Sequence, residues 1–450
     1  MTVTFPKDFV WGTATAAYQI EGAVDADGRG VSIWDTFSHT PGNILNGDTG
    51  DVADDHYHHW QSDVARLGEL GVRAYRFSVA WPRILPDGVG RINSAGLDFY
   101  DRLVDRLLGE GITPWATLYH WDLPQALQDR GGWGSRDTID AYVTYADIVA
   151  TRLGDRVKHW MTHNEPWVVA FLGNLLGVHA PGLKDLALSL TVAHNVLVSH
   201  GRAVPVIRAA SQGAQVGIVL NPHVVIPASD SPEDAAAAQH FDGFMNRWFL
   251  DPLYGRGYPA DMLALFGASA PAIHPGDMEA IAVPTDFLGV NTYSPAFVRA
   301  DPSAELGFGN VTPEELAARG YELTTMGWAV VPDGMRQLLE RLHRDYAPRA
   351  LYVAENGAAF ADVPKDGAVH DERRIAYLDA YLRAAHQALS AGVPLRGYFV
   401  WSFLDNFEWS FGYSQRFGLV YVDYETLARI PKDSAFWYRD VIRRGGLLEG

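Results

Sequence analysis

Residues 157–166 read VKHWMTHNEP, a short strand-like run that ends in a carboxylate and a proline. Residues 157–161 have the composition of a short buried strand, and Pro166 lacks the backbone N–H that a continuing strand would use. Proline also disfavours helical geometry at the residue before it. We therefore expect the strand to end at Glu165, with this carboxylate at the C-terminal end of the strand.

A second segment follows the same pattern. Residues 350–354 (ALYVA) form an apolar run, and Glu355, Asn356 and Gly357 follow directly. Each predicted strand thus ends in a glutamate that has an asparagine beside it. Two neighbouring carboxyl groups suit the cleavage of a glycosidic bond, because one donates a proton while the other acts as nucleophile or activates water. This pair is the basis of the functional hypothesis.

Six further predicted strands accompany these two. Apolar runs predict strands at residues 9–20, 72–81, 112–121, 157–165, 215–222, 286–293, 350–355 and 395–402. Helical periodicity predicts helices at residues 138–153, 186–210, 234–249, 333–346, 371–391 and 432–444, among others. Strands that are apolar on both faces and alternate eight times with helices predict an α/β fold, a single (β/α)8 TIM barrel formed by residues 1–450.

The chain is longer than most such barrels. Its extra residues fall in the segments that follow the first, fourth, fifth, sixth and eighth strands, and residues 294–331 are expected to be irregular. Segments of this kind lie at the C-terminal face of a barrel. Long loops are therefore expected to wall in a deep pocket.

Composition excludes several classes of function. The net charge is −18, which disfavours a nucleic-acid partner, and the chain has no cysteine. No apolar run reaches membrane-spanning length, and no signal peptide is visible, so a cytoplasmic protein is expected. Glycine-rich phosphate loops are missing as well, so we expect no cofactor. The sequence leaves the oligomeric state open.

One acidic and histidine-rich stretch raises the alternative of a metal site. It contains Asp51, Asp54, Asp55, His56, His58 and His59. No recognisable ligand motif completes it, and acidic residues at a helix start also complement the helix dipole. No metal is expected.

Polar and aromatic side chains at the predicted strand ends should converge on one mouth of the barrel. They are Gln19, Arg76, His120, Asn164, Glu165, Asn291, Tyr293, Glu355, Trp401, Glu408 and Trp409. Each also has a purely structural explanation; Arg76, for example, would serve equally as an ion-pair partner. In the functional interpretation, its guanidinium holds Glu355 ionised by lowering the pKa of that carboxyl group.

Seven motifs in order resemble the retaining β-glucosidases of glycoside hydrolase family 1. They are residues 9–22 (FVWGTATAAYQIEG), 75–83 (YRFSVAWPR), 118–124 (LYHWDLP), 162–166 (THNEP), 289–295 (GVNTYSP), 353–357 (VAENG) and 401–409 (WSFLDNFEW). The resemblance runs from end to end and implies a (β/α)8 barrel. Two positions differ from the usual family pattern: Ala354 replaces threonine and Thr292 replaces tyrosine, which we interpret as changes in packing.

The resemblance also implies roles for individual residues. Glu165 resembles the general acid/base and Glu355 the nucleophile, whose carboxyl groups are expected about 5 to 5.5 Å apart. The residues that resemble groups binding the glycone, the sugar that is released, are Gln19, His120, Asn164, Tyr293, Glu408 and Trp409, with Trp401 as its floor. Arg76 and Asn291 resemble groups around the nucleophile, and Trp121, Trp167 and Trp328 the leaving-group side.

The expected substrate is a small-molecule β-glucoside such as cellobiose, another short β-glucoside or an aryl glucoside. Glu408 would repel a phosphate, and residues 402–415 contain no lysine or arginine, which favours an unphosphorylated sugar. Three alternatives stay open at this point: a broader β-glycosidase acting on galactosides or fucosides, a transglycosylase, and a sugar-binding barrel without activity.

Overall fold

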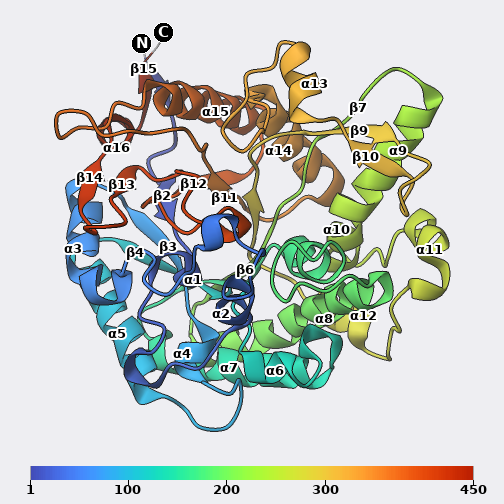
Figure 1. The fold of residues 1–450 in the computed structure, drawn as a ribbon, viewed down its shortest axis with the longest axis horizontal. Coiled ribbons are helices and arrows are strands. Elements are labelled where there is room, and N and C mark those ends of the chain that lie inside the picture. The colour runs from blue at the N-terminus through green and yellow to red at the C-terminus, as the bar shows by residue number, and fades with distance from the viewer. Residues whose placement is uncertain (1, 449–450) are drawn as a thin grey trace.

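The structure is a computed structural model that describes residues 2–448 (Figure 1). Eight parallel strands close into a barrel in the order β11-β12-β2-β3-β4-β5-β6-β8. Their bounds are β2 (Val10–Ala14), β3 (Ala74–Ser78), β4 (Thr113–Tyr119), β5 (His159–Asn164), β6 (Gln215–Leu220), β8 (Phe287–Asn291), β11 (Leu351–Asn356) and β12 (Leu395–Trp401). β8, at one end of this order, pairs with β11 at the other end, which closes the cylinder. The predicted barrel is therefore confirmed. The predicted domain also includes residues 1, 449 and 450, which lie outside the described residues.

Helices cover the outside of the barrel. The longer ones are α3 (His56–Glu69), α5 (Ser94–Gly109), α7 (Asp137–Leu153), α8 (Leu186–Ala210), α9 (Pro232–Asp242), α14 (Pro332–Tyr346), α15 (Glu372–Ser390) and α16 (Asp433–Arg444). α14 shows why such a segment is helical: Pro332 occupies its first turn, and Met335, Leu338, Leu339 and Leu342 form one buried stripe. Within residues 2–448, none of the helices combines the length and the apolar character that crossing a membrane requires.

Shorter elements complete the fold. The short helices are α1 (Ala17–Ile20), α2 (Ile33–Ser38), α4 (Trp81–Ile84), α6 (Gln125–Gln128), α10 (Trp248–Leu253), α11 (Ala260–Phe266), α12 (Asp277–Ile281) and α13 (Pro313–Ala318). β1 (Thr2–Thr4) pairs with β15 (Gly446–Leu448), so the two ends of the chain meet, and β13 (Val420–Val422) pairs with β14 (Arg429–Pro431).

The inside of the barrel is filled by aromatic rings. The Trp115 ring stacks on His159 with centroids 4.0 Å apart and meets Phe399 at 5.2 Å. Glycines make room for these rings: a Cβ atom on Gly12 would lie 2.3 Å from Phe399 Cδ1, and one on Gly217 would lie 2.5 Å from Phe287 Cε2. This packed interior closes the barrel, so that a ligand must bind at the strand ends.

Three sequence predictions are wrong in detail. The first strand ends at Ala14, because the Ala17 N–H is taken by Ser78 Oγ at 2.7 Å and the chain turns into α1, which carries Gln19. The predicted helix at 234–249 is three pieces, α9, the π-helix η5 (Gly243–Arg247) and α10.

The third correction concerns residues 294–331, predicted as irregular. They contain β9 (Ala296–Ala300), β10 (Phe308–Asn310) and α13. β9 pairs with β10 and with β7 (Val225–Pro227), which makes a separate three-stranded sheet that α9 covers (Figure 1). Phe297 and Val298 of β9 are buried on the two faces of this sheet, and this packing gives order to the segment.

Candidate active site

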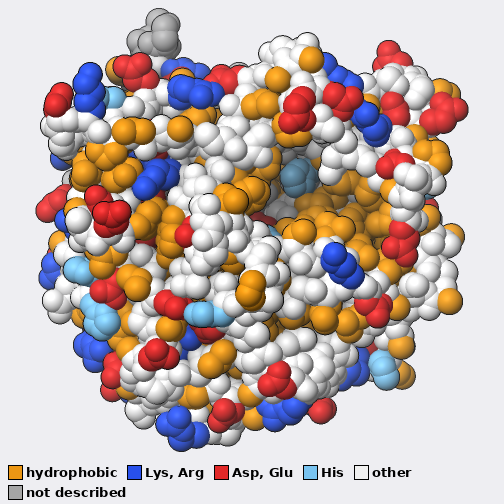
Figure 2. All heavy atoms as spheres, in the orientation of Figure 1, with side chains coloured by type: hydrophobic (Ala, Val, Ile, Leu, Met, Phe, Trp, Pro, Cys, Tyr) orange, Lys and Arg blue, Asp and Glu red, His pale blue; other side chains and the backbone are white. Residues whose placement is uncertain are grey.

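A cavity of about 840 Å³ opens where the barrel strands end. Figure 2 shows it as a hollow in one face of the molecule, bordered by hydrophobic side chains. Eleven of the predicted site residues line it: His120, Trp121, Glu165, Trp167, Asn291, Tyr293, Trp328, Glu355, Trp401, Glu408 and Trp409. The other three, Gln19, Arg76 and Asn164, are buried behind that lining. The predicted deep pocket with loop walls is therefore present.

Glu355 lies near the end of β11 and is held from two sides. Arg76 Nη1 donates to its Oε1 at 2.6 Å, and Tyr293 Oη donates to its Oε2 at 2.7 Å. Arg76 comes from the middle of β3 and is fully buried. Both donors favour the charged form of the carboxyl group and fix its orientation.

Glu165 directly follows β5 and has a different environment. Asn291 Nδ2 donates to its Oε1 at 2.5 Å, and within residues 2–448 no cation pairs with it. Its backbone lies in the left-handed region, with φ of 49°, a conformation that costs an ordinary residue on the order of 1–2 kcal/mol. The Glu165 N–H donates to Val219 O of β6 at 2.9 Å, and this bond helps to hold the unusual backbone.

The pKa values of the two carboxyl groups follow from these contacts. Burial, and then the charge of Glu355, raise the pKa of Glu165 to about 8. Burial also raises the pKa of Glu355, against the opposing effects of Arg76, Tyr293 and Asn291. Arg76 thus lowers the pKa of Glu355, as expected, but burial of the carboxyl group outweighs this effect. A proton shared by the pair rests on Glu165, since the donors around Glu355 stabilise its charge.

Asn164 links the two sides of the site. Its Oδ1 accepts from Arg76 Nη2 at 2.5 Å and from Asn291 Nδ2 at 3.0 Å, which leaves Nδ2 to donate to His120 Nε2 at 3.0 Å. His120 must therefore accept at Nε2 and carry its proton on Nδ1. Burial lowers the pKa of His120 well below its usual value, so the ring is neutral.

Gln19 and Glu408 form a second polar group in the site. Gln19 Nε2 donates to Asn406 Oδ1 and Phe407 O, each at 2.9 Å, and meets Glu408 Oε2 at 3.5 Å. Burial, and then the charge of Glu355, raise the pKa of Glu408 to about 8. Within the described residues, the buried atoms Gln19 Oε1 and His120 Nδ1 have no hydrogen-bond partner.

Tryptophans form the apolar part of the same region. The Trp401 ring stacks with His120 at 6.0 Å, and Trp409 meets Trp121 at 4.4 Å. Trp121 and Trp409 both have left-handed backbones, with φ of 81° and 50°. Trp121, expected on the leaving-group side, thus packs among residues expected to hold the glycone, and its Nε1 donates to Asn164 O at 2.9 Å.

The other two tryptophans pack against other aromatic rings that line the cavity. The Trp328 ring is 5.1 Å from Tyr293, and Trp167 packs against Phe244 at 5.7 Å. Both are half-buried and line the cavity. Their place on the leaving-group side stays a prediction.

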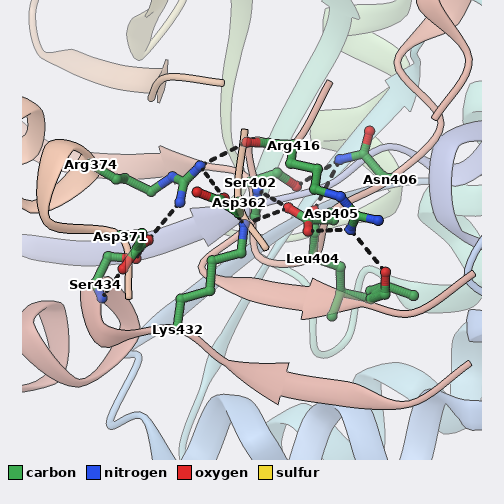
Figure 3. Close-up of polar contacts among 12 residues, drawn as sticks. Asp362, Asp371, Arg374, Ser402, Leu404, Asp405, Asn406, Arg416, Lys432 and Ser434 are labelled. Carbon is green, nitrogen blue, oxygen red and sulfur yellow. Dashed lines mark hydrogen bonds and ion pairs between the residues drawn. The ribbon is translucent and has the colours of Figure 1, made fainter. Parts of the chain in front are cut away.

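A buried network of charges supports the segment that carries Glu408 (Figure 3). Lys432 Nζ lies 2.5 Å from Asp362 Oδ2 and 2.7 Å from Asp405 Oδ1, and Arg416 Nη1 lies 2.7 Å from Asp405 Oδ2. Asp405 also accepts from the Gly418 N–H at 2.8 Å. The network therefore holds the loop after β12 in place at Asp405, which precedes Glu408 by three residues.

Sequence reasoning missed several of these groups. Asn406 orients Gln19 but has no strand-end position that would single it out. Phe308 lines the cavity from β10, a strand that the sequence did not predict, and Phe244 lines it from η5, the π-helical turn inside the helix predicted at 234–249. The charged pairs of Figure 3 are separated by up to 70 residues, so no local pattern reveals them.

Histidines of the stretch at residues 51–59 form hydrogen bonds with carboxyl groups. His56 Nδ1 lies 2.9 Å from Asp63 Oδ2, and Arg429 Nε lies 3.1 Å from Asp63 Oδ1. His58 Nδ1 lies 2.6 Å from Asp55 Oδ1. Among residues 2–448, no group of three or more His, Cys, Asp and Glu side chains is arranged to hold a metal ion.

Comparison with known proteins gives consistent results over the length of the chain. The model of glycosyl hydrolase family 1 matches residues 1–447. β-Glucosidase A of Acetivibrio thermocellus is 50% identical over 447 residues, 99% of each chain, and thermostable β-glucosidase B of Thermobispora bispora is 52% identical over 452 residues, 100% of this chain and 92% of that one. The solved structure of a family 1 β-glucosidase from Thermotoga maritima superimposes with a TM-score of 0.96, at 50% identity and with all of both chains covered. With a family match of this extent and two buried glutamates at the ends of β5 and β11, the chain belongs to glycosyl hydrolase family 1.

Proposed function

We propose that this protein is a β-glucosidase that hydrolyses terminal β-D-glucosyl residues with retention of configuration. One observation carries the proposal: two buried carboxyl groups meet at the barrel mouth in opposite environments. Glu355 is bound by Arg76 and Tyr293, while the amide of Asn291 is the hydrogen-bond donor to Glu165. Retaining hydrolysis needs this difference, because one group must be an anion while the other is an acid.

In the first step, a carboxylate oxygen of Glu355 attacks the anomeric carbon of the bound sugar. The bond from that carbon to the leaving oxygen breaks, and Glu165 gives its proton to this oxygen. The product is an ester between the sugar and Glu355, with inverted configuration, and the alcohol leaves. The raised pKa of Glu165, about 8, keeps it protonated at neutral pH for this step.

In the second step, water attacks the anomeric carbon and Glu165, now ionised, takes the proton of that water. The ester bond breaks, Glu355 is released as a carboxylate, and the second inversion restores the original configuration. Since the ester removes the charge of Glu355, the pKa of Glu165 falls between the two steps, as a base requires.

The remaining polar groups bind the glucosyl ring. Gln19, His120 and Glu408 surround it with hydrogen-bond partners, and Trp401 supplies an apolar face. Glu165, Glu355 and Glu408 give the site an excess of carboxyl groups over its one arginine, Arg76, which supports a neutral, unphosphorylated sugar. We assign these roles to a single catalytic domain of residues 1–450, and the cytoplasmic location stays a prediction.

The test is the Glu355→Gly variant with p-nitrophenyl β-D-glucoside as substrate. We expect strong activity in the wild type, loss of at least a thousandfold in the variant, and partial rescue by added azide or formate with a product of inverted configuration. NMR of fresh wild-type product should show β-glucose first. A variant as active as the wild type would refute the role of Glu355.

A further inference from the structure

Tyr293 lies outside the regular strands of the barrel. β8 ends at Asn291 and β9 begins at Ala296, so the residues between them belong to neither strand. Tyr293 nevertheless places its hydroxyl 2.7 Å from Glu355 Oε2. Whatever holds this short segment in place therefore decides whether that hydrogen bond forms.

Side chains from other elements bind the backbone carbonyls of this segment. Asn356 Nδ2 donates to Thr292 O at 2.6 Å. Tyr377 Oη donates to Tyr293 O at 3.1 Å, and Tyr381 Oη donates to the same oxygen at 2.9 Å. Because a carbonyl oxygen has two lone pairs, these two phenols occupy both of its acceptor positions. The backbone of Tyr293 is therefore held by α15, a helix on the outside of the barrel (Figure 1).

Tyr377 and Tyr381 form a buried, stacked pair one helical turn apart. Their ring centroids are 4.0 Å apart, and the ring planes meet at 19°. The Tyr377 hydroxyl also accepts from Asn356 Nδ2 at 3.1 Å. The Tyr381 hydroxyl also accepts from the Val331 N–H at 3.1 Å. Each phenol has one proton to donate, and each directs it to Tyr293 O.

The same contacts tie the backbone of Tyr293 to that of the proposed nucleophile. Asn356 follows Glu355 in β11, and its amide binds both Thr292 O and Tyr377 Oη. The Thr292 N–H donates in turn to Glu355 O at 3.0 Å. The two backbones are thus joined by hydrogen bonds that do not involve the reacting carboxyl group.

We propose that Tyr377 and Tyr381 are positioning residues for the nucleophile: they hold the Tyr293 backbone where its hydroxyl meets Glu355 Oε2. The inference rests on the proposed function, because it concerns the carboxylate that attacks the sugar in that reaction. Neither Tyr377 nor Tyr381 is among the described residues that line the cavity, so both act through Tyr293 and not by contact with a bound sugar. A hydrogen bond weakens steeply as its geometry worsens, so a small shift of Tyr293 would destabilise the Glu355 anion.

Titratable groups reach Glu355 from four parts of the barrel mouth. They are Arg76 of β3, Glu165 after β5, Tyr293 after β8 and Glu408 after β12. Phenylalanine substitutions on α15 remove two buried hydroxyls and leave all four groups in the chain. A shift in the acid limb of the pH–rate profile would therefore report on the geometry of the Tyr293 hydrogen bond.

The test is the double variant Tyr377→Phe, Tyr381→Phe, with kcat/KM for p-nitrophenyl β-D-glucoside measured from about pH 4 to 9. A weaker hydrogen bond from Tyr293 raises the pKa of Glu355, because the charged form loses a donor. The acid limb should therefore move to higher pH by about 0.5 unit or more. At the optimum pH, kcat/KM should fall about three- to thirtyfold.

Tyr438→Phe is the matched control. Tyr438 is a buried tyrosine of α16, and its hydroxyl lies 3.0 Å from Gly12 O and 3.4 Å from Tyr398 O, two carbonyls of barrel strands. This variant should leave the acid limb in place. Thermal unfolding identifies any variant that fails to fold. If the double variant does, Tyr381→Phe, which loses the shorter of the two contacts with Tyr293 O, decides by a shift of the acid limb in the same direction.

The same two substitutions in a Tyr293→Phe background separate positioning from a general effect on the fold. The hydroxyl that Tyr377 and Tyr381 position is gone there, so adding both substitutions should change kcat/KM less than about twofold and should not move the acid limb further. A loss as large as in the wild-type background, or an acid limb that the double variant does not move, would overturn the inference.

Failure of this inference and failure of the proposed function give different results. If the wild type hydrolyses the glucoside with retention and only the variants of α15 behave otherwise than expected, the proposed function stays intact. If the wild type hydrolyses no β-glucoside, the proposed function itself fails.

Discussion

Arg76 Nη1 lies 2.6 Å from Glu355 Oε1, although 279 residues separate the two in the sequence. The contact joins the middle of β3 to the end of β11 across the closed barrel. Arg76 also donates to Asn164 Oδ1 at 2.5 Å, so one cation orders both sides of the site. Within the described residues, Glu165 and Glu408 have no cation partner, and burial therefore dominates their protonation.

The first prediction concerns the alkaline limb of the pH–rate profile. The pKa of Glu165 is about 8, so kcat/KM for p-nitrophenyl glucoside should fall above about pH 8 as this acid loses its proton. The leaving group of 2,4-dinitrophenyl glucoside needs no proton. With this substrate, the pH–rate profile of the first step in Glu165→Gln should therefore lack the alkaline limb. Burst kinetics from pH 5 to 10 measure this step.

Glu408 provides the control for this assignment, because its pKa is also about 8. Glu408→Gln should keep an alkaline limb, moved to slightly lower pH, since the charge of Glu408 contributes to the raised pKa of Glu165. A limb that persists in Glu165→Gln and vanishes in Glu408→Gln would assign it to Glu408 instead.

The second prediction is that the site carboxyl groups destabilise the folded protein at high pH. A carboxyl group with a folded-state pKa of about 8, against about 4.5 in the unfolded chain, keeps its proton longer when folded. Its contribution to stability is therefore present below about pH 4.5 and is lost as the pH rises to about 8. Glu408→Gln, which cannot ionise, should unfold a few degrees above the wild type at pH 9 and within a degree of it at pH 5. Calorimetry at both pH values checks this, and an equal difference at both would contradict it.

The third prediction isolates Tyr293. Tyr293→Phe removes the 2.7 Å hydrogen bond to Glu355 Oε2, which stabilises the charged carboxylate. The pKa of Glu355 should rise, so the acid limb of kcat/KM should move to higher pH and kcat should fall roughly 10- to 100-fold. Tyr254→Phe is the control, because Tyr254 is a partly buried tyrosine outside the cavity. An unchanged acid limb together with a lower kcat would show that Tyr293 acts on packing alone.

The barrel was predictable because each of its strands is an apolar run that can be recognised in the sequence alone. Residues 287–291 and 351–356 are short apolar runs that must be covered on both faces, and helical periodicity fills the chain between them. The sheet formed by β7, β9 and β10 had no such signal. β7 and β10 have only three residues each, and Val298 of β9 is buried by packing against Ala237 and Phe241 of α9.

Glu165 and Glu355 could be found for a similar reason: each lies at the end of a buried strand. The groups that orient them could not. Asn406 and Asp405 lie in an irregular loop, where a residue's role depends on partners brought by the fold, such as Gln19 and Lys432. The direction of the net pKa shift of Glu355 could not be predicted from the sequence either, because it depends on the depth of burial as well as on the neighbouring arginine.

The fourth prediction tests the buried charge network of Figure 3. Lys432 is fully buried between Asp362 and Asp405, so Lys432→Met leaves both carboxylates short of a partner. The free energy of unfolding should fall by roughly 3–5 kcal/mol. Lys158→Met is the control, because that ammonium meets only the carbonyls of Gly154 and Gln212 near the surface and its loss should cost less than about 1 kcal/mol.

The double variant Lys432→Met, Asp362→Asn separates the ion pair from the packing of the lysine stem. Removing both charges restores the balance of charge: Asp405 keeps Arg416, at 2.7 Å, and Arg374, which loses its 2.7 Å contact with Asp362, keeps Asp371 at 2.5 Å. The free energy of unfolding that the double variant loses should therefore be smaller, by roughly 1–3 kcal/mol, than the sum of the losses in the two single variants. Urea unfolding measures all three losses. Strictly additive losses in the free energy of unfolding would show that Lys432 stabilises the loop before Glu408 through the packing of its aliphatic carbons. The ion pairs of Figure 3 would then contribute little.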